Sequence, residues 1–213
     1  MIYERTDLYR VIFNFHEKLE IAWEREFQQH YGAFRAVVRE SFNRYLSCGI
    51  LAHGCARAEC QDKNCKHSIL IAFSCKCRGL CPACAKKRGI IFAETLHEDV
   101  LLPVEQAHIV FTIPKRLRGF FRYDRNLNQL LFSSAWESIC DLFEEVLPGC
   151  KPGCVLSLES SGELLNFNVH LHGLLTMGAF DSEGNFHPLP HIDALALQKL
   201  FQHKLLHALK DQG

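Results

Sequence analysis

The stretch Leu165-Asn166-Phe167-Asn168-Val169-His170-Leu171-His172-Gly173 decides how the second half of this chain is interpreted. Side chains of a β-strand alternate between its two faces. The apolar side chains therefore share one face, which can pack on a core, and His170 and His172 share the other. Two imidazoles at this spacing can hold one cation. The pattern predicts a half-buried strand that presents a metal site.

The composition narrows the class of protein. A chain of 213 residues, 48% of them hydrophobic, is long enough for one substantial domain or two small ones with a sizeable core. The first residues do not form a signal peptide, and no apolar run approaches membrane-spanning length, so we expect a cytoplasmic protein. In that reducing compartment, eleven cysteines favour metal binding over disulfides.

Positive charge is concentrated locally, although Lys+Arg and Asp+Glu are equal at 24 each. Residues 55–89 carry eight Lys or Arg against two acidic residues, and a second basic patch covers 115–125. Such runs often form only a solvated surface, but they can also neutralise nucleic-acid phosphates. The candidate DNA-binding residues are Lys76, Arg78, Lys86, Lys87, Arg88, Lys115, Arg116 and Arg118.

Hydrophobic periodicity predicts an α+β protein in three parts. Residues 1–47 form N-terminal helices, 48–98 a zinc-binding module too irregular for long elements, and 99–213 an α+β domain. Besides the histidine strand, strands are expected over 107–113 and 155–159. The expected helices cover 7–30, 33–46, 89–98, 126–147 and 193–210.

The cysteine-rich segment contains two short pairs, Cys60 with Cys65 and Cys81 with Cys84. Two turns that each offer two thiolates can complete a Zn²⁺ tetrahedron. Four thiolates leave no open position, so the expected zinc is structural. The ligand set remains open, because a second zinc or substitute ligands are conceivable among Cys48, Cys55, Cys75, Cys77, His53 and His67.

The histidine pair predicts a second kind of metal site. Neutral imidazoles suit Mn, Zn or Fe, and with an additional ligand they can hold Mg²⁺ for phosphate chemistry. His108, in a separate expected strand, is a candidate third ligand, and Asn168 is another. A histidine that merely packs in a core is the alternative for His108.

Three motifs in order resemble the rolling-circle insertion-sequence transposases of the HUH (His-hydrophobic-His) type. They are Ser74–Cys84, His108–Pro114 and Leu165–His172, and the resemblance covers about residues 35–185. It implies an antiparallel ferredoxin- or RRM-like sheet with flanking helices. It further implies that His170 and His172 bind Mg²⁺ or Mn²⁺ on a central strand, that zinc is bound through the two cysteine pairs, and that the partner is single-stranded or hairpin DNA.

The resemblance has two departures. Many relatives carry a further histidine where this chain has Asn168. A histidine-triad nucleotide hydrolase needs three alternating histidines, so Asn168 also argues against that class of enzyme. The family's nucleophile is a tyrosine beyond the histidine strand, whereas no tyrosine here follows Tyr123. We therefore expect an incomplete, C-terminally truncated nuclease domain that does not itself cleave DNA. The alternative is a non-catalytic, zinc-dependent DNA-binding remnant.

Overall fold

The computed structural model describes residues 6–77, 79–162 and 166–212. The chain divides into two compact units, Met1–Leu102 and Pro103–Gly213. The first unit therefore contains both the expected N-terminal helices and the cysteine-rich segment. None of the helices within the described ranges is long and apolar enough to cross a lipid bilayer.

The first unit begins with two helical segments that pack together. They comprise α1 (Asp7–Ala22), the π-helical turn η2 (Trp23–Phe27), α2 (Gln28–Tyr31) and α3 (Ala36–Leu46). The Thr6 side chain caps α1 by accepting the Tyr9 N–H at 3.2 Å. Gly32, with a φ of +79°, ends α2, because this backbone conformation suits glycine. The two expected helices are thus confirmed, although the second begins a few residues later than expected.

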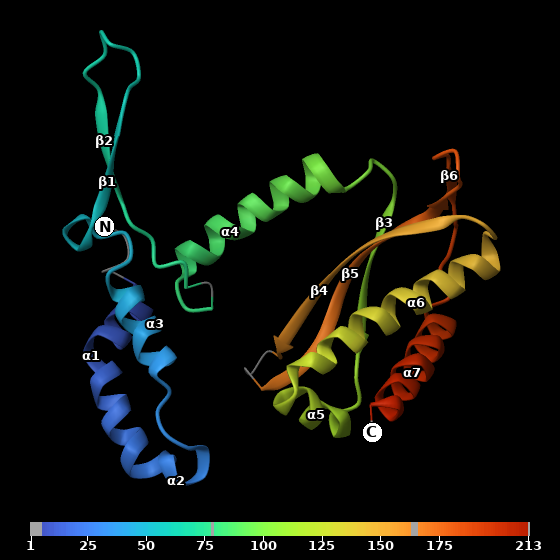
Figure 1. The fold of residues 1–213 in the computed structure, drawn as a ribbon, viewed down its shortest axis with the longest axis horizontal. Coiled ribbons are helices and arrows are strands. Elements are labelled where there is room, and N and C mark those ends of the chain that lie inside the picture. Colours follow the sequence, from blue (N-terminus) through green and yellow to red (C-terminus); the bar gives the residue numbers. More distant parts are fainter. Residues whose placement is uncertain (1–5, 78, 163–165, 213) are drawn as a thin grey trace. The chain divides into compact units, whose positions relative to one another are not determined.

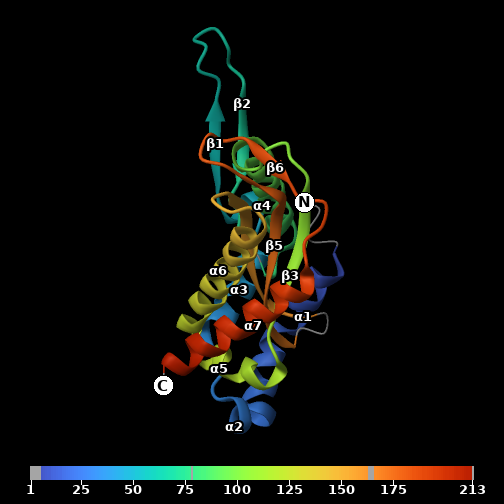
Figure 2. The ribbon, with the colours of Figure 1, turned by 90° about the vertical axis from the view of Figure 1, so that its right-hand side faces the viewer.

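A β-hairpin, which the sequence did not predict, follows α3. Its strands β1 (Cys55–Glu59) and β2 (Ser68–Ala72) pair antiparallel, and its tip at residues 60–67 extends away from α1 and α3 (Figures 1 and 2). Ile69, Leu70 and Ile71 are all exposed. Neither face is buried, so the apolar and polar alternation that usually marks a strand is absent. Helix α4 (Pro82–Thr95) begins earlier than expected, with Pro82 in its first turn, and continues into η4 (Leu96–Val100).

The second unit is an antiparallel sheet with helices. Its order along the chain is β3 (Gln106–Thr112), α5 (Arg118–Tyr123), α6 (Asn128–Val146), β4 (Lys151–Ser161), β5 (Phe167–Phe180), β6 (Phe186–Pro188) and α7 (Ala194–Asp211). The sheet order is β3-β5-β4, and β6 pairs with the far end of β5. The histidine strand is therefore central. Leu165, at the start of the expected strand, lies outside the described residues.

The core of the second unit lies on one face of this sheet, beneath α6 and α7 (Figure 1). Val169, Leu171 and Leu175 of β5 are buried, as the alternation predicted, and Phe111 of β3 contacts Phe201 of α7 with ring centroids 4.9 Å apart. The succession β3–α6–β4–β5–α7 corresponds to the first five elements of the ferredoxin-like motif. The expected α+β class is confirmed.

Candidate metal and nucleic-acid sites

Four cysteines of the first unit gather around one point. They are Cys48 after α3, Cys75 after β2, and Cys81 and Cys84 at the start of α4. The Sγ–Sγ distances are 3.7 Å for Cys48–Cys84, 3.6 Å for Cys75–Cys84 and 3.8 Å for Cys48–Cys81. A Zn–S bond of about 2.3 Å gives a tetrahedron with edges of about 3.8 Å. The sulfur positions therefore fit one tetrahedral zinc ion.

This cluster differs from the ligand set expected from sequence spacing. Cys81 and Cys84 are in it, but their companions are Cys48 and Cys75. Cys60 and Cys65 are exposed at the hairpin tip, because β1 and β2 carry them away from the start of α4. Within the described ranges, no other group of three or more potential ligands gathers in this way.

Backbone amides surround the cysteine sulfurs. The Cys75 N–H donates to Cys48 Sγ at 3.3 Å, and the Cys77 N–H donates to Cys75 Sγ at 3.4 Å. Between them Lys76 has a φ of 55°, the left-handed conformation that is uncommon outside glycine. Burial raises the pKa of Cys48 and of Cys75. A bound cation would offset this desolvation and keep the thiolates deprotonated.

The cysteine cluster is also the core of the first unit. The residues buried together there are Ile12, Tyr45, Cys48 and Cys81, with Tyr9 and other partly buried side chains packed against them. Metal binding and folding of this unit therefore depend on the same contacts.

The histidine pair lies on the opposite face of the second sheet from α6 and α7. In the strand register, Thr112 of β3 and Glu159 of β4 stand on either side of His170, and Ser157 stands beside His172. Residues directly opposite in an antiparallel pair share a face. The ring centroids of His170 and His172 are 4.9 Å apart. The central strand thus displays two imidazoles: His170 lies between Thr112 and Glu159, and His172 lies between the apolar Val110 and Ser157.

Hydrogen bonds orient the two imidazoles. His170 Nδ1 lies 2.8 Å from the Asn168 carbonyl oxygen. A carbonyl only accepts, so Nδ1 carries the proton and the Nε2 lone pair is free for a metal. His108 Nε2 lies 2.9 Å from His172 Nδ1, and the two rings stack. Asn168 Oδ1 is buried without a hydrogen-bond partner among the described residues, so it is a spare oxygen beside the pair. Imidazole nitrogen and amide oxygen are both donor types that can coordinate a divalent cation.

Glu159 is the residue of this face that the sequence did not reveal. It closes the expected strand 155–159, but nothing in the sequence specifies which residue of the neighbouring strand lies opposite it. The observed pairing with His170 places a carboxylate on the histidine face. In the sequence, the only sign of its role is that an acidic residue ends an expected strand.

The candidate DNA-binding residues are distributed over both units. Arg118 is half-buried, with Nε lacking a partner, and Arg78 lies outside the described residues. Within the described part of the chain, the exposed members form no ion pair with a carboxylate. These exposed cations are Lys76, Lys86, Lys87, Arg88, Lys115 and Arg116.

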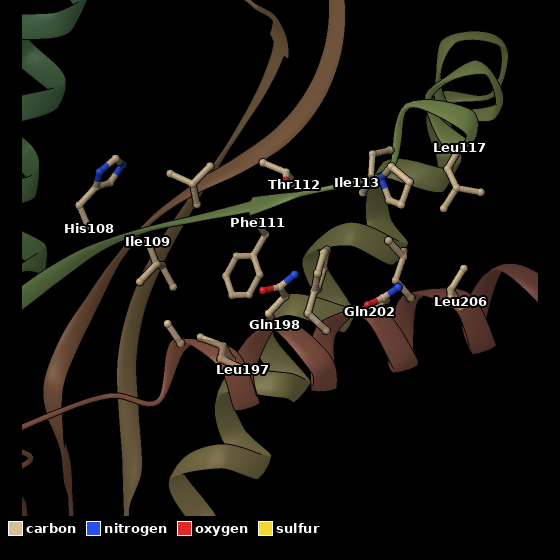
Figure 3. A pocket seen from close by; sticks show the side chains of 15 residues that line it. His108, Ile109, Phe111, Thr112, Ile113, Leu117, Leu197, Gln198, Gln202 and Leu206 are labelled. Carbon is tan, nitrogen blue, oxygen red and sulfur yellow. The ribbon is translucent and has the colours of Figure 1, made fainter.

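A pocket of about 670 Å³ lies between β3 and α7. Figure 3 shows Ile109 and Phe111 pointing towards α7, whereas His108 and Thr112 lie on the other side of β3. The lining is mainly apolar and includes Leu197. The pocket therefore belongs to the core side of the sheet, and the histidine pair lies on the opposite face.

Residues 19–113 match the family model of the transposase zinc-binding domain. The chain is also 30% identical, over 153 residues, to the transposase for insertion sequence element IS801 of Pseudomonas savastanoi pv. phaseolicola. The chain is similar to insertion-sequence transposases. The alignment covers 72% of this chain but only 36% of that transposase. No solved structure gives a significant match.

The family model matches the part of the chain that contains the four-cysteine cluster and does not reach the histidine pair. The matched range contains all four clustered cysteines, helix α4 and the whole of β3. His170 and His172 lie beyond it. Structural zinc binding thus has support from both the family model and the sulfur geometry, whereas the histidine face rests on its own geometry.

Proposed function

We propose that this chain is the DNA- and metal-binding portion of an insertion-sequence transposase of the HUH type, acting in the cytoplasm. The observation that carries the proposal is the half-buried histidine pair on the face of the central strand opposite the apolar core. There His170 and His172 stand side by side with polar neighbours from both flanking strands. A strand that only packed on α6 and α7 would not require two imidazoles on its other face.

In this proposal Cys48, Cys75, Cys81 and Cys84 bind structural Zn²⁺. Their sulfurs have tetrahedral spacing, and four thiolates fill the coordination sphere of the ion. Such a closed site stabilises a fold and offers no position for substrate. The zinc therefore holds α4 and the Lys76 loop in place, and it takes no part in chemistry on DNA.

The histidine face is proposed to bind Mg²⁺ or Mn²⁺. His170 contributes Nε2, and His172 contributes Nε2 when its Nδ1 donates to His108. In that arrangement His108 orients His172 rather than binding the metal. Asn168 Oδ1 and the Glu159 carboxylate are the oxygen ligands within the same face. When bound, the cation would neutralise charge that develops on a phosphoryl group.

DNA binding is proposed to use the unpaired cations of both units. In the first unit these are Lys76 and the exposed row Lys86, Lys87 and Arg88 of α4, and in the second they follow β3. Phosphate contacts of this kind are independent of sequence. Single-stranded or hairpin DNA is the proposed substrate, because a metal face on an open sheet can reach an unpaired backbone.

Strand cleavage in the HUH type uses a tyrosine beyond the histidine strand, and these 213 residues contain none after Tyr123. Tyr123 is 87% exposed at the end of α5. For this chain we therefore propose binding of transposon-end DNA and of the cation, with cleavage and strand transfer belonging to the complete protein. The second candidate function, a non-catalytic DNA-binding remnant, shares the binding steps.

Fluorescence anisotropy with labelled single-stranded, hairpin and duplex oligonucleotides tests the proposal. Replacing Lys86, Lys87 and Arg88 together by glutamine should weaken binding of every sequence. It should also lower the slope of log affinity against log salt by about 2, since each single-strand phosphate contact contributes about 0.7. An unchanged salt slope would exclude α4 from the DNA interface.

Incubation of a 5′-labelled single strand with Mn²⁺ tests whether this chain itself cleaves DNA, which neither candidate function expects. No cleavage by the 213-residue chain is expected. Cleavage that disappears in Tyr123→Phe would show that Tyr123 is the nucleophile and would overturn our assignment.

A further inference from the structure

Helix α5 carries aromatic side chains on both its buried and its exposed sides. Phe121 is 2% exposed and belongs to the core of the second unit, whereas Phe120 is 61% exposed and Tyr123 is 87% exposed. Residues three apart on a helix are neighbours on one face, with Cβ atoms about 5–6 Å apart. Phe120 and Tyr123 therefore form a pair of exposed rings on a helix that Phe121 anchors.

Positive charge surrounds this aromatic pair. Residues 115–125 contain five Lys or Arg and a single acidic residue, Asp124, whose carboxylate accepts the Asn126 N–H at 2.9 Å. The exposed cations of this segment are Lys115, Arg116, Arg122 and Arg125. An occupant of the surface needs negative charge together with flat apolar faces. A nucleic-acid strand with unpaired bases combines the two, since its phosphates meet the cations and its bases can meet the rings.

Helix α5 lies at the end of the sheet where His170 stands. Thr112, the last residue of β3, is opposite His170, and only residues 113–117 separate it from α5. The helix packs against β5, and Phe121 belongs to the same core as Val169 (Figure 1). A DNA strand bound near His170 would therefore have neighbouring nucleotides within reach of the aromatic pair.

We propose that Phe120 and Tyr123 form a stacking platform for unpaired bases of the bound DNA strand. Every base has a π-face, so such a platform tolerates any sequence. It favours single strands and loops, because bases inside a duplex already stack on one another. The platform rests on the proposed DNA binding, to which it adds the means of distinguishing an unpaired strand from a duplex.

Fluorescence anisotropy on the full chain, with a labelled oligothymidine and an abasic strand of the same length, tests this platform. The two strands carry the same phosphate charge, so a difference in affinity comes from the bases. The unmodified chain should bind oligothymidine more tightly. Phe120→Leu combined with Tyr123→Leu should weaken oligothymidine binding by about fivefold or more, the effect of losing one stacked base. Affinity for the abasic strand and the salt slope should stay unchanged.

Two further variants serve as controls. Tyr123→Phe should keep the preference for oligothymidine, because the ring remains and only the hydroxyl is lost. Phe13→Leu should also keep it, since Phe13 is 60% exposed but lies on α1 of the first unit. Equal loss of the preference in Phe13→Leu would show that the effect is not specific to α5 and would overturn the platform.

The outcomes separate the platform from the function on which it rests. If neither strand binds, the proposed DNA binding fails and the platform fails with it. Equal affinity for both strands, with a normal salt slope, would overturn the platform alone. If the double leucine variant keeps its preference but changes oligomeric state in size-exclusion chromatography, the rings form a protein contact and the platform is likewise overturned.

Tryptophan fluorescence gives an independent readout at the more exposed position. Tyr123→Trp adds an indole to the two tryptophans of the chain, Trp23 and Trp136. The added fluorescence should be quenched by oligothymidine and left unquenched by the abasic strand, because a stacked base quenches an indole that it contacts. Unquenched fluorescence at saturating oligothymidine would rule out stacking at this position.

Discussion

Replacing Cys48 by serine should release the cluster zinc and unfold the first unit while the second unit stays folded. Cys48 is buried, and its Sγ lies 3.7 Å from Cys84 Sγ and 3.8 Å from Cys81 Sγ. A serine hydroxyl stays protonated at neutral pH and is a poor zinc ligand. The variant would therefore leave three thiolates around an incomplete site.

The magnitudes explain why the first unit cannot tolerate this loss. Outside the cysteines its buried apolar side chains are Ile12 and Tyr45, and full burial of one such side chain contributes about 1.5–3 kcal/mol. A structural zinc ion contributes about 10–16 kcal/mol. Fixing the backbone of a single residue already costs about 1–2 kcal/mol. Zinc is therefore the largest stabilising contribution in this unit, whereas the second unit has its own apolar core.

Hydrogen–deuterium exchange read by mass spectrometry would follow each unit separately. In Cys48→Ser, amides of α3 and α4 should exchange far faster, and amides of α6 should keep their protection. Cys77→Ser is the matched control, because Cys77 adjoins the cluster without belonging to it. The reasoning is refuted if Cys48→Ser keeps its zinc and its protection, or if Cys77→Ser loses both.

Three further predictions concern the remaining sites. His170→Ala with His172→Ala should abolish Mn²⁺ binding, measured by electron paramagnetic resonance, without changing zinc content; loss of zinc would contradict two separate sites. Lys76→Gly should keep zinc, because glycine accepts a φ of 55°, yet lower DNA affinity and the salt slope by about 0.7. Asp193 accepts the N–H groups of Leu195 and Ala196 at the start of α7, and the Ala196 N–H is the largest cause of its lowered pKa. This stabilisation is present above the ordinary pKa of an aspartate and is lost as the pH falls through the lowered value. Thermal unfolding of Asp193→Asn should therefore show a weaker acid dependence than the unmodified chain.

The histidine strand was predictable because its information is local. Alternation with period two assigns each residue of β5 to a face, and the buried Val169 and Leu171 confirm the assignment. The long helix α6 was predictable for the same reason, since its apolar positions recur at helical spacing. Both elements bury one face against a core.

The zinc ligands were only half predictable. Cys81 and Cys84 lie in one helical turn, so their proximity follows from sequence spacing. Cys48 and Cys75 approach them because a hairpin returns the chain to the end of α3, where the Gly49 N–H donates to the Phe73 carbonyl at 2.9 Å. That hairpin buries neither face and leaves no periodic signal. The spacing identified Cys60 and Cys65 as a pair without showing that they lie at its far end.

The structural zinc and the proposed Mg²⁺ or Mn²⁺ site differ in where their donor atoms lie. The four thiolates are at the centre of a unit with little other core, where a closed, tightly held ion replaces hydrophobic packing. The imidazoles are half-buried on a sheet face whose opposite side already has an apolar core, so no ion is required for folding there. A cation bound there, as we propose, would be able to exchange ligands with a phosphate. Chelation that removes zinc should therefore unfold one unit, whereas removal of Mg²⁺ or Mn²⁺ should leave both units folded and change only the interaction with DNA.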